Sequence, residues 1–540
     1  HVYYMDLPIR VFDVRIFDDD DTHPNGWGTI LVAGMRFGGG NDNSGISVDV
    51  DADGDGDNDI KTKSAYVVLD VTDPEQAPKV IAEISPPNAQ FTTSVPQVVG
   101  LGTPEGKTGP NKWYLVFGTG PTNLASATYE SYGDPLQNAN VFVYDLAAML
   151  SASDEDDNNG LLRTLDIPQE DVFVGDIVST DFDIDMKDEA LYFGTVGAPV
   201  TGDTDPDDVE QGSLYRVLIS ENPTVSGWSE PVRLIEDLNR PFVTQPAVTV
   251  DRKFRRWVIA ASGRLYTNED KITENQQSAY GFIDPIVMGE STPLVTEVGD
   301  LVDVSYAQVF SNDVVEGVTL DSSADSDGND SISTKELREA VAAAGGWRKD
   351  FAINGELPID SVDDEDDTED DTDSAIKPAE RAASRISLFG GVMFSSLFTP
   401  STDLCGSDGS SRLLAVDFST GVPLSRSIFP CADCDDPTVP IPESFNQGGG
   451  FSSSASIHFG NQTTEGRVTV VTQDSRGELE STEAQTGAGD PAAEISWREF
   501  PNLETGMGDE AGSGAGGGGG GSGSGGDSGS GGGSPSGGGP

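Results

Sequence analysis

The chain has 540 residues, and its 92 acidic side chains against 31 Lys and Arg give a formal net charge of −61 at pH 7. An excess of this sign repels phosphates, so we expect no nucleic-acid partner and no binding to an anionic membrane. No apolar run is long enough to span a bilayer, so we also expect no membrane insertion.

Short runs rich in Val, Ile, Tyr and Phe recur along the chain between clusters of Gly, Pro, Asn and Asp. Many short strands between turns are typical of an all-β sandwich, barrel or propeller. A run that ends in a glycine-rich turn is often followed by a strand that ends in Asp, and this loose repeat favours propeller blades with long insertions. The predicted strands are 29–33, 65–69, 113–117, 141–144, 190–193, 214–217, 257–261, 413–416 and 468–471.

The first acidic insertion, residues 42–59, alternates aspartate with small residues and glycine. Alternating oxygens around a glycine turn suit Ca²⁺, which takes about six to eight oxygen ligands. A solvated acidic loop is the alternative. No carboxylate stands at the twelfth position of the loop, so we expect a lower affinity. The predicted ligands are Asp51, Asp53, Asp55, Asp57 and Asp59.

A second ladder of carboxylates lies in a turn between two strand-like runs. Asp181, Asp183, Asp185 and Glu189 occupy positions 1, 3, 5 and 9 of this turn. Hard oxygen ligands in a tight loop again suit Ca²⁺, which tolerates irregular geometry. The predicted local structure is a calcium-stapled turn between strands, and a solvated acidic turn is the alternative.

The segment 325–336 has the spacing of an EF-hand loop, with oxygen-bearing side chains at positions 1, 3, 5, 7, 9 and 12. The sixth position, where EF-hands have glycine, holds Asp330. Residues 336–344 are predicted to form the exiting helix, ended by Gly345, whereas no entering helix precedes the loop. We therefore predict an EF-hand-like insertion over 321–345 with the calcium ligands Asp325, Asp327, Asn329, Ser331, Ser333 and Glu336.

Two further segments are predicted to be disordered or flexible. Residues 360–374 concentrate too many like charges to fold alone, and the chain becomes almost pure Gly and Ser from Gly506. The predicted organisation is a β domain over 1–505 and a tail over 506–540.

Neither cysteine nor histidine chemistry gives a catalytic site. Cys431 and Cys434 are predicted to form a disulfide in a loop or to remain thiols, and Cys405 has no assigned partner. No two of the three histidines have metal-ligand spacing, and no nucleophile elbow, phosphate loop or zinc signature occurs. We therefore expect that the chain is not an enzyme.

Short sequence segments along most of the chain are similar, when taken in order, to segments of a known protein family. They are 1–6, 29–34, 66–74, 113–120, 181–194, 212–216, 263–264, 280–284, 346–347, 398–400, 405 and 496–499. In this order they resemble the C-terminal domain of the PilY-type tip adhesins of bacterial type IV pili. The resemblance implies a modified seven-bladed β-propeller, similar in shape to quinoprotein dehydrogenases. It also implies that the turn at 181–189 is the family's regulatory calcium site, although Met186 replaces the usual glycine and Glu189 the usual aspartate.

The resemblance implies a calcium-binding protein of the type IV pilus system that acts in tip adhesion, pilus biogenesis and control of extension and retraction. Its implied partners are pilin or minor pilins and a host or abiotic surface, at an extracellular location reached through the periplasm. The alternative is a structural subunit of an extracellular filament, in which neighbouring chains complete open propellers. Because the chain begins at His1 within a strand-like run, we interpret it as a processed piece of a longer protein.

Overall fold

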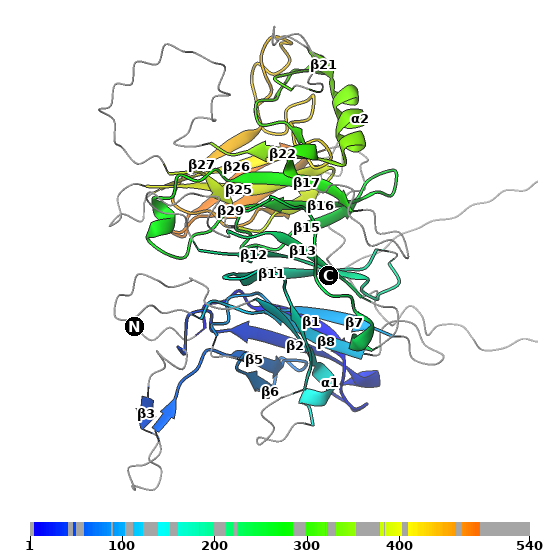
Figure 1. The fold of residues 1–540 in the computed structure, drawn as a ribbon, viewed down its shortest axis with the longest axis vertical. Coiled ribbons are helices and arrows are strands. Elements are labelled where there is room, and N and C mark those ends of the chain that lie inside the picture. The colour runs from blue at the N-terminus through cyan, green and yellow to red at the C-terminus, as the bar shows by residue number, and fades with distance from the viewer. Residues whose placement is uncertain are drawn as a thin grey trace, which may run out of the picture. The chain divides into compact units, whose positions relative to one another are not determined.

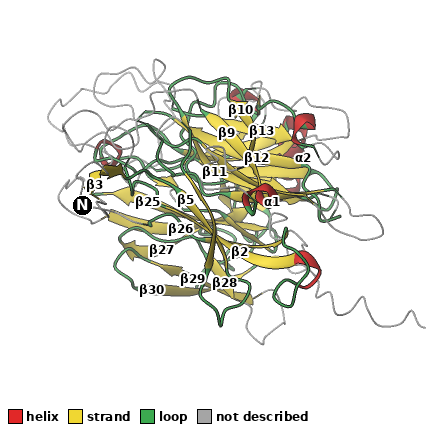
Figure 2. Cartoon of the chain, turned by 90° about the horizontal axis from the view of Figure 1, so that it is seen from below, coloured by secondary structure: helices red, strands yellow, loops and turns green. Residues whose placement is uncertain are grey.

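The computed structural model divides into two compact units, His1–Trp497 and Arg498–Pro540, and every described residue belongs to the first. Strands predominate, and the few helices are short (Figure 2). The described residues are 5–40, 47–49, 59–87, 90–102, 112–122, 139–151, 160–182, 184–198, 211–219, 224–284, 297–318, 320, 331–352, 378–382, 384–401, 409–458 and 467–486.

The first three sheets are four-stranded and antiparallel. Figure 1 labels most of their strands, which lie in the blue to teal part of the chain. The first sheet contains β1 (Arg10–Arg15), β2 (Trp27–Gly34), β5 (Tyr66–Asp70) and β6 (Lys79–Ile84). The second contains β7 (Gln97–Leu101), β8 (Lys112–Gly118), β9 (Asn140–Asp145) and β10 (Leu161–Asp166). The third contains β11 (Phe173–Thr180), β12 (Ala190–Val196), β13 (Leu214–Leu218) and β14 (Val232–Arg233).

Three further sheets continue this pattern. The fourth contains β15 (Ala247–Val250), β16 (Arg256–Ala261), β17 (Ser278–Asp284), β22 (Gly346–Asp350) and, parallel to β22, β18 (Val302–Asp303). The fifth contains β23 (Arg381–Ala382), β25 (Val392–Pro400), β26 (Gly409–Asp417) and β27 (Ser444–Gly449), with β24 (Ser387–Phe389) paired to β25. The sixth contains β28 (Ser456–His458), β29 (Arg467–Gln473) and β30 (Leu479–Gln485).

The remaining elements are small. One three-stranded sheet contains β19 (Gln308–Val309), β20 (Val314–Glu316) and β21 (Ile332–Ser333), and one hairpin contains β3 (Ser47–Asp49) and β4 (Asp59–Lys61). The helices are α1 (Leu146–Met149) and α2 (Thr334–Ala344), with short 3-10 turns at Pro24–Gly26, Val225–Gly227, Glu269–Lys271 and Val298–Asp300. Gly345 ends α2 in the left-handed conformation, with φ of 91°, so the predicted helix and its glycine stop are confirmed.

From the second sheet to the sixth, each sheet packs an apolar face against the next sheet along the chain. One core joins Val116 and Val143 of the second sheet to Leu191 of the third, and another joins Tyr192 of the third to Val258 of the fourth. Two more cores join the fourth sheet to the fifth and the fifth to the sixth. Burial of these faces removes apolar surface from water, which is the main driving force of folding.

The all-β fold predicted from the sequence is confirmed, and each of the nine predicted strands lies in or overlaps an observed strand. The strand-ending aspartates of the repeat also end observed strands: Asp70, Asp145, Asp284 and Asp417. The seven-bladed ring, the EF-hand insertion and the domain boundary at 505 stay predictions. Residues 360–374 and 506–540 lie outside the described part of the chain.

A disulfide lies between β26 and β27. Cys431 and Cys434 form a disulfide, which confirms one of the two states predicted for them. Cys405 lies outside the described residues. Across the described ranges, no helix has the length and apolar character needed to cross a membrane.

Candidate metal centre

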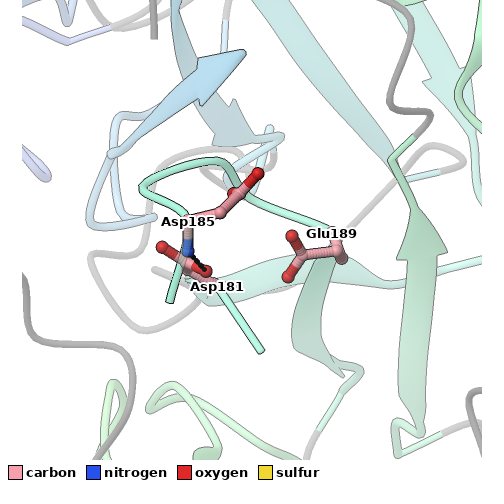
Figure 3. Close-up of side chains that lie close together, drawn as sticks. All are labelled: Asp181, Asp185 and Glu189. Atoms are coloured by element: carbon pink, nitrogen blue, oxygen red, sulfur yellow. Dashed lines mark hydrogen bonds between the residues drawn. The ribbon is translucent and has the colours of Figure 1, made fainter. Parts of the chain in front are cut away.

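The loop between β11 and β12 brings three carboxylates together (Figure 3). One oxygen from each of Asp181, Asp185 and Glu189 lies within 4.8 Å of the others. Asp181 is buried, and the other two residues are half-buried. Asp183, the fourth predicted ligand, lies outside the described residues. Three of the four predicted ligands are therefore close enough to share one cation.

The backbone of this loop is folded around its own carboxylates. Strand pairing ends where Thr180 faces Ala190. The two oxygens of Asp181 accept hydrogen bonds from the backbone N–H groups of Asp185 at 3.1 Å and Met186 at 2.7 Å. An oxygen of Glu189 accepts a hydrogen bond from the backbone N–H of Phe182 at 2.5 Å. These bonds fix the carboxylates in place, and a carboxylate oxygen has further lone pairs to offer to a cation.

Two residues of the loop adopt the left-handed backbone conformation, which non-glycine residues rarely take. Met186 has φ of 69°, and Ile184 has φ of 60°. Ile184 is β-branched, and its side chain is 81% exposed. Backbone strain of this kind persists where surrounding contacts over-determine the conformation, and it is frequent at ligand clamps.

The loop combines the three clustered carboxylates with nearby cationic side chains. The ammonium group of Lys187 forms an ion pair with Asp185 inside the loop, and both side chains are partly exposed. The guanidinium of Arg256 also lies close to this loop, over the ring of Phe182. A cluster made of carboxylate oxygens matches the hard ligands that Ca²⁺ prefers, whereas softer metals favour imidazole or thiolate.

Asp188 positions the loop although the sequence analysis did not assign it a role. It is 3% exposed, its oxygen accepts a hydrogen bond from the Gly100 N–H at 2.8 Å, and its own N–H donates to the Gly100 carbonyl at 3.1 Å. This paired contact ties the end of the loop to β7 in the second sheet. No local pattern signals it, because the two residues are far apart in sequence.

The loop also contacts the fourth sheet. The guanidinium of Arg256 lies 4.1 Å from the centroid of the Phe182 ring, and Phe182 in turn meets the ring of Tyr192 edge-on. The Tyr192 hydroxyl donates to Asp284 at 2.7 Å, and Asp284 forms a buried ion pair with Arg216. Burial first, and then the Asp284 charge, raise the pKa of Tyr192 well above its usual value, so its hydroxyl stays a donor.

The other predicted calcium sites are only partly described. Ser331 is exposed, and Ser333 caps α2, where its hydroxyl accepts from the Glu336 N–H at 3.2 Å. The Glu336 carboxylate accepts from the Ser333 N–H and hydroxyl, both at 2.8 Å, and these bonds lower its pKa. Calcium binding by this segment stays a prediction, because three of its ligands lie outside the described residues: Asp325, Asp327 and Asn329.

The first acidic loop is described only at its base. Asp59 begins β4 and pairs with Asp49 of β3. The pairing places the two ends of the loop side by side. The remaining predicted ligands of this loop lie outside the described residues: Asp51, Asp53, Asp55 and Asp57.

Taken together, successive antiparallel sheets and an acidic hairpin loop define an all-β domain with a candidate cation site. No protein-family profile and no curated protein sequence matches the chain. Among solved structures, the chain is similar to the C-terminal domain of PilY1 from Pseudomonas aeruginosa. The TM-score is 0.51 and the identity 17%, over 89% of this chain and 84% of that chain.

A second solved structure is a rhamnogalacturonan lyase, PL11, from Bacillus licheniformis. It is 11% identical over 90% of this chain and 91% of that chain, with a TM-score of 0.21 that carries no argument. The chain therefore has a PilY1-like fold, and the resemblance inferred from the sequence is confirmed at the level of the fold.

Proposed function

We propose that the chain is a calcium-binding protein of the type IV pilus system, exposed at the bacterial surface and acting in pilus tip adhesion or biogenesis. The observation that carries the proposal is the convergence of Asp181, Asp185 and Glu189 in a chain with the PilY1-like fold. We further propose that the protein has no catalytic activity, that it is exported through the periplasm, and that it contacts pilin or minor pilins.

Calcium would act at this site through charge and backbone order. A divalent cation neutralises the mutual repulsion of the three carboxylates and makes the strained loop conformation favourable. The cation thereby stabilises the folded state by mass action, by about 2.7 kcal/mol at a free concentration of 100 times its Kd. An ordered loop also restrains the neighbouring sheets, because Asp188 contacts the second sheet and Phe182 contacts the fourth.

Calorimetric titration of the purified chain with Ca²⁺, together with thermal unfolding, tests the metal site. The double variant Asp181→Asn/Glu189→Gln removes two charges but keeps the shape of both side chains. We expect it to lose one binding event and the corresponding rise in Tm, whereas Glu480→Gln, an exposed site on β30, should behave like the wild type. Absence of wild-type binding at millimolar Ca²⁺ would refute the site.

Binding to purified type IV pili tests the pilus assignment. We expect the chain to co-sediment with pili in Ca²⁺ and to be released by EGTA if the metal site controls the contact. Co-sedimentation that is indifferent to EGTA would keep the pilus assignment and refute calcium control. Ordered helical arrays of the isolated chain in electron micrographs would instead favour the filament subunit.

A further inference from the structure

Asp176 is a carboxylate that the candidate metal centre does not use. It lies in β11 of the third sheet and accepts a hydrogen bond at 2.9 Å from the Val95 N–H, in the segment that leads into β7 of the second sheet. Its own N–H donates at 2.9 Å to the carbonyl of Val243, in the segment that leads into β15 of the fourth sheet. Asp176 therefore lies where the second, third and fourth sheets meet.

Three arginines from two other sheets surround this carboxylate. Burial raises the pKa of Asp176 to about 6, and the positive charges of Arg10, Arg36 and Arg385 partly offset this effect. Arg10 belongs to β1 and Arg36 follows β2, both in the first sheet, whereas Arg385 precedes β24 of the fifth sheet. Groups from five of the six successive sheets therefore converge around Asp176.

Two of the three arginines are held by other groups. Arg10 donates to the side-chain oxygen of Gln245 at 2.8 Å, and Arg36 forms an ion pair with Asp6 at 3.4 Å. Arg385 is half-buried, and its only polar interaction with the described residues is the charge attraction to the β11 carboxylate. Arginine carries five N–H donors in a planar fork that matches a carboxylate. Arg385 is therefore the cation of this cluster that can offer its donors to a ligand.

The cluster lies inside the fold and still reaches solvent. Asp176, Arg385, Phe37 and Tyr266 are each half-buried, yet burial is the largest cause of the raised pKa of both Asp176 and Tyr266. The Tyr266 ring meets Phe37 edge-on at 5.7 Å, and the guanidinium of Arg36 lies 5.6 Å from the Tyr266 centroid. Aromatic side chains beside a few convergent polar groups are typical of small-molecule sites.

Two buried polar side chains next to the cluster have unsatisfied hydrogen-bonding groups. Residues 90–95 run from the bridge with Arg36 to the hydrogen bond with Asp176. In this segment the Thr93 hydroxyl and both amide atoms of Gln90 have no hydrogen-bond partner among the described residues, and the two residues are 5% and 1% exposed. Most buried polar groups in native proteins are hydrogen-bonded, so exceptions indicate an ordered water or a ligand.

We propose that these residues form a binding site for a small carboxylate that also carries hydroxyl groups, which is the chemistry of a sugar acid. Arg385 binds the carboxylate through its planar fork. Thr93 and Gln90 exchange hydrogen bonds with the ligand hydroxyl groups. The rings of Phe37 and Tyr266 pack against the carbon skeleton. The site needs no cation, so it is independent of the proposed calcium site and of the pilus assignment.

The charge of Asp176 makes this site selective for a monoanion and dependent on pH. A second negative charge on the ligand would be repelled by Asp176, and protonation of Asp176 removes the repulsion of the first. Binding should therefore strengthen between pH 7 and pH 5, where a ligand carboxylate stays ionised. Arg and Tyr side chains keep one protonation state in this range. The other charged or titratable groups around Asp176 are Arg10, Arg36, Arg385, Tyr66 and Tyr266.

Calorimetric titration of the full chain with D-glucuronate tests the proposal, in EGTA so that the metal site plays no part. We expect saturable binding at millimolar concentration. D-glucose has the same ring without the carboxylate and should bind at least about tenfold more weakly, since a charge-assisted hydrogen bond is lost. The affinity for glucuronate should rise about fivefold between pH 7 and pH 5, if the bound anion raises the pKa of Asp176 by about one unit.

Three variants and one matched control locate the site. Arg385→Gln removes the charge and should weaken glucuronate binding about tenfold or more. Thr93→Val keeps the shape of the side chain but loses the hydroxyl, and should weaken binding about threefold. Asp176→Asn does not titrate, so its binding should not change between pH 7 and pH 5. Arg252→Gln alters an exposed arginine outside the cluster and should bind like the wild type.

Circular dichroism and the melting curve show that each variant is folded. Failure of glucuronate to saturate the wild type at tens of millimolar would overturn the proposal. Equal affinities for glucuronate and glucose, or unchanged binding by folded Arg385→Gln, would overturn it too. A pH dependence that persists in Asp176→Asn would refute the role given to Asp176.

Discussion

Arg256 of β16 lies over the aromatic ring of Phe182, with its guanidinium carbon 4.1 Å from the ring centroid. Phe182 belongs to the acidic loop of the third sheet, and Arg256 begins the second strand of the fourth sheet. The contact therefore joins the candidate metal centre to the next sheet along the chain.

Loss of this cation–π contact should destabilise the folded chain. We expect Arg256→Gln to lower the free energy of unfolding by about 1 kcal/mol, because a partly desolvated pair of this kind contributes about 0.5–2 kcal/mol. Urea denaturation of both proteins measures the difference. Arg252→Gln, at the exposed tip of the same turn, is the control and should change stability little. Equal effects of the two substitutions would contradict the role assigned to the ring contact.

Lys187 should compete with calcium for the acidic loop. Its ammonium group pairs with Asp185, so a cation that binds this carboxylate has to displace it or share it. We expect Lys187→Met to strengthen calcium binding about threefold to tenfold, since the removal of a nearby positive charge favours a divalent cation. Calorimetry on the variant checks this, with Lys79→Met at an exposed position of β6 as the control. Weaker binding by Lys187→Met would show that the ammonium supports the site.

Asp188 should matter for stability through its acceptor oxygen and not through its charge. Replacement by Ala leaves the buried N–H of Gly100 without this acceptor, at a cost of about 1–3 kcal/mol. Asp188→Asn keeps a carbonyl oxygen in the same place and should lose much less. Chemical denaturation separates the two variants. A similar loss in both would mean that the negative charge, and not the hydrogen bond, is what the fold requires.

The carboxyl group of Asp176 makes the free energy of unfolding depend on pH. Burial raises its pKa to about 6, and the hydrogen bond from the Val95 N–H and the charges of Arg10, Arg36 and Arg385 only partly offset this effect. The folded state therefore holds a proton that the unfolded chain has already released. This group's contribution to stability is complete at pH values below about 4 and is lost as the pH rises toward and through about 6.

The variant Asp176→Asn keeps an acceptor for the Val95 N–H but does not titrate. We expect the wild type to lose on the order of 2–3 kcal/mol relative to this variant between pH 4 and pH 7. The difference between the two unfolding free energies isolates Asp176 from the other acids of the chain. A difference that is constant with pH would mean that the pKa of Asp176 is not raised.

The strands and the acidic loop could be predicted because both depend on local sequence. A run such as Trp113–Phe117 has the composition of a buried strand, and the four-residue separation of Asp181 and Asp185 places both in one turn. The helix after Ser333 has a capping residue before it and Gly345 after it, which are both local signals.

The features that sequence reasoning missed depend on contacts between distant residues. Asp188 meets Gly100 across 88 positions, and Arg216 meets Asp284 across 68. No periodicity within either segment encodes such a partner. The left-handed conformation of Ile184 was also missed, because a β-branched residue is the last that a rule about turns would place there.

Because the apolar cores lie between successive sheets, the loops of this fold can vary in length and sequence more freely than its strands. Some hairpin loops, such as 251–255, contribute no side chain to the four apolar cores, so a loop can lengthen there without disturbing a core. Each doubling of a flexible loop costs only about 0.6 kcal/mol in closure entropy. A turn such as 251–255 can therefore change in length or sequence while the neighbouring sheets keep their apolar cores, whereas the turn 181–189 is held to two sheets by Asp188 and Phe182.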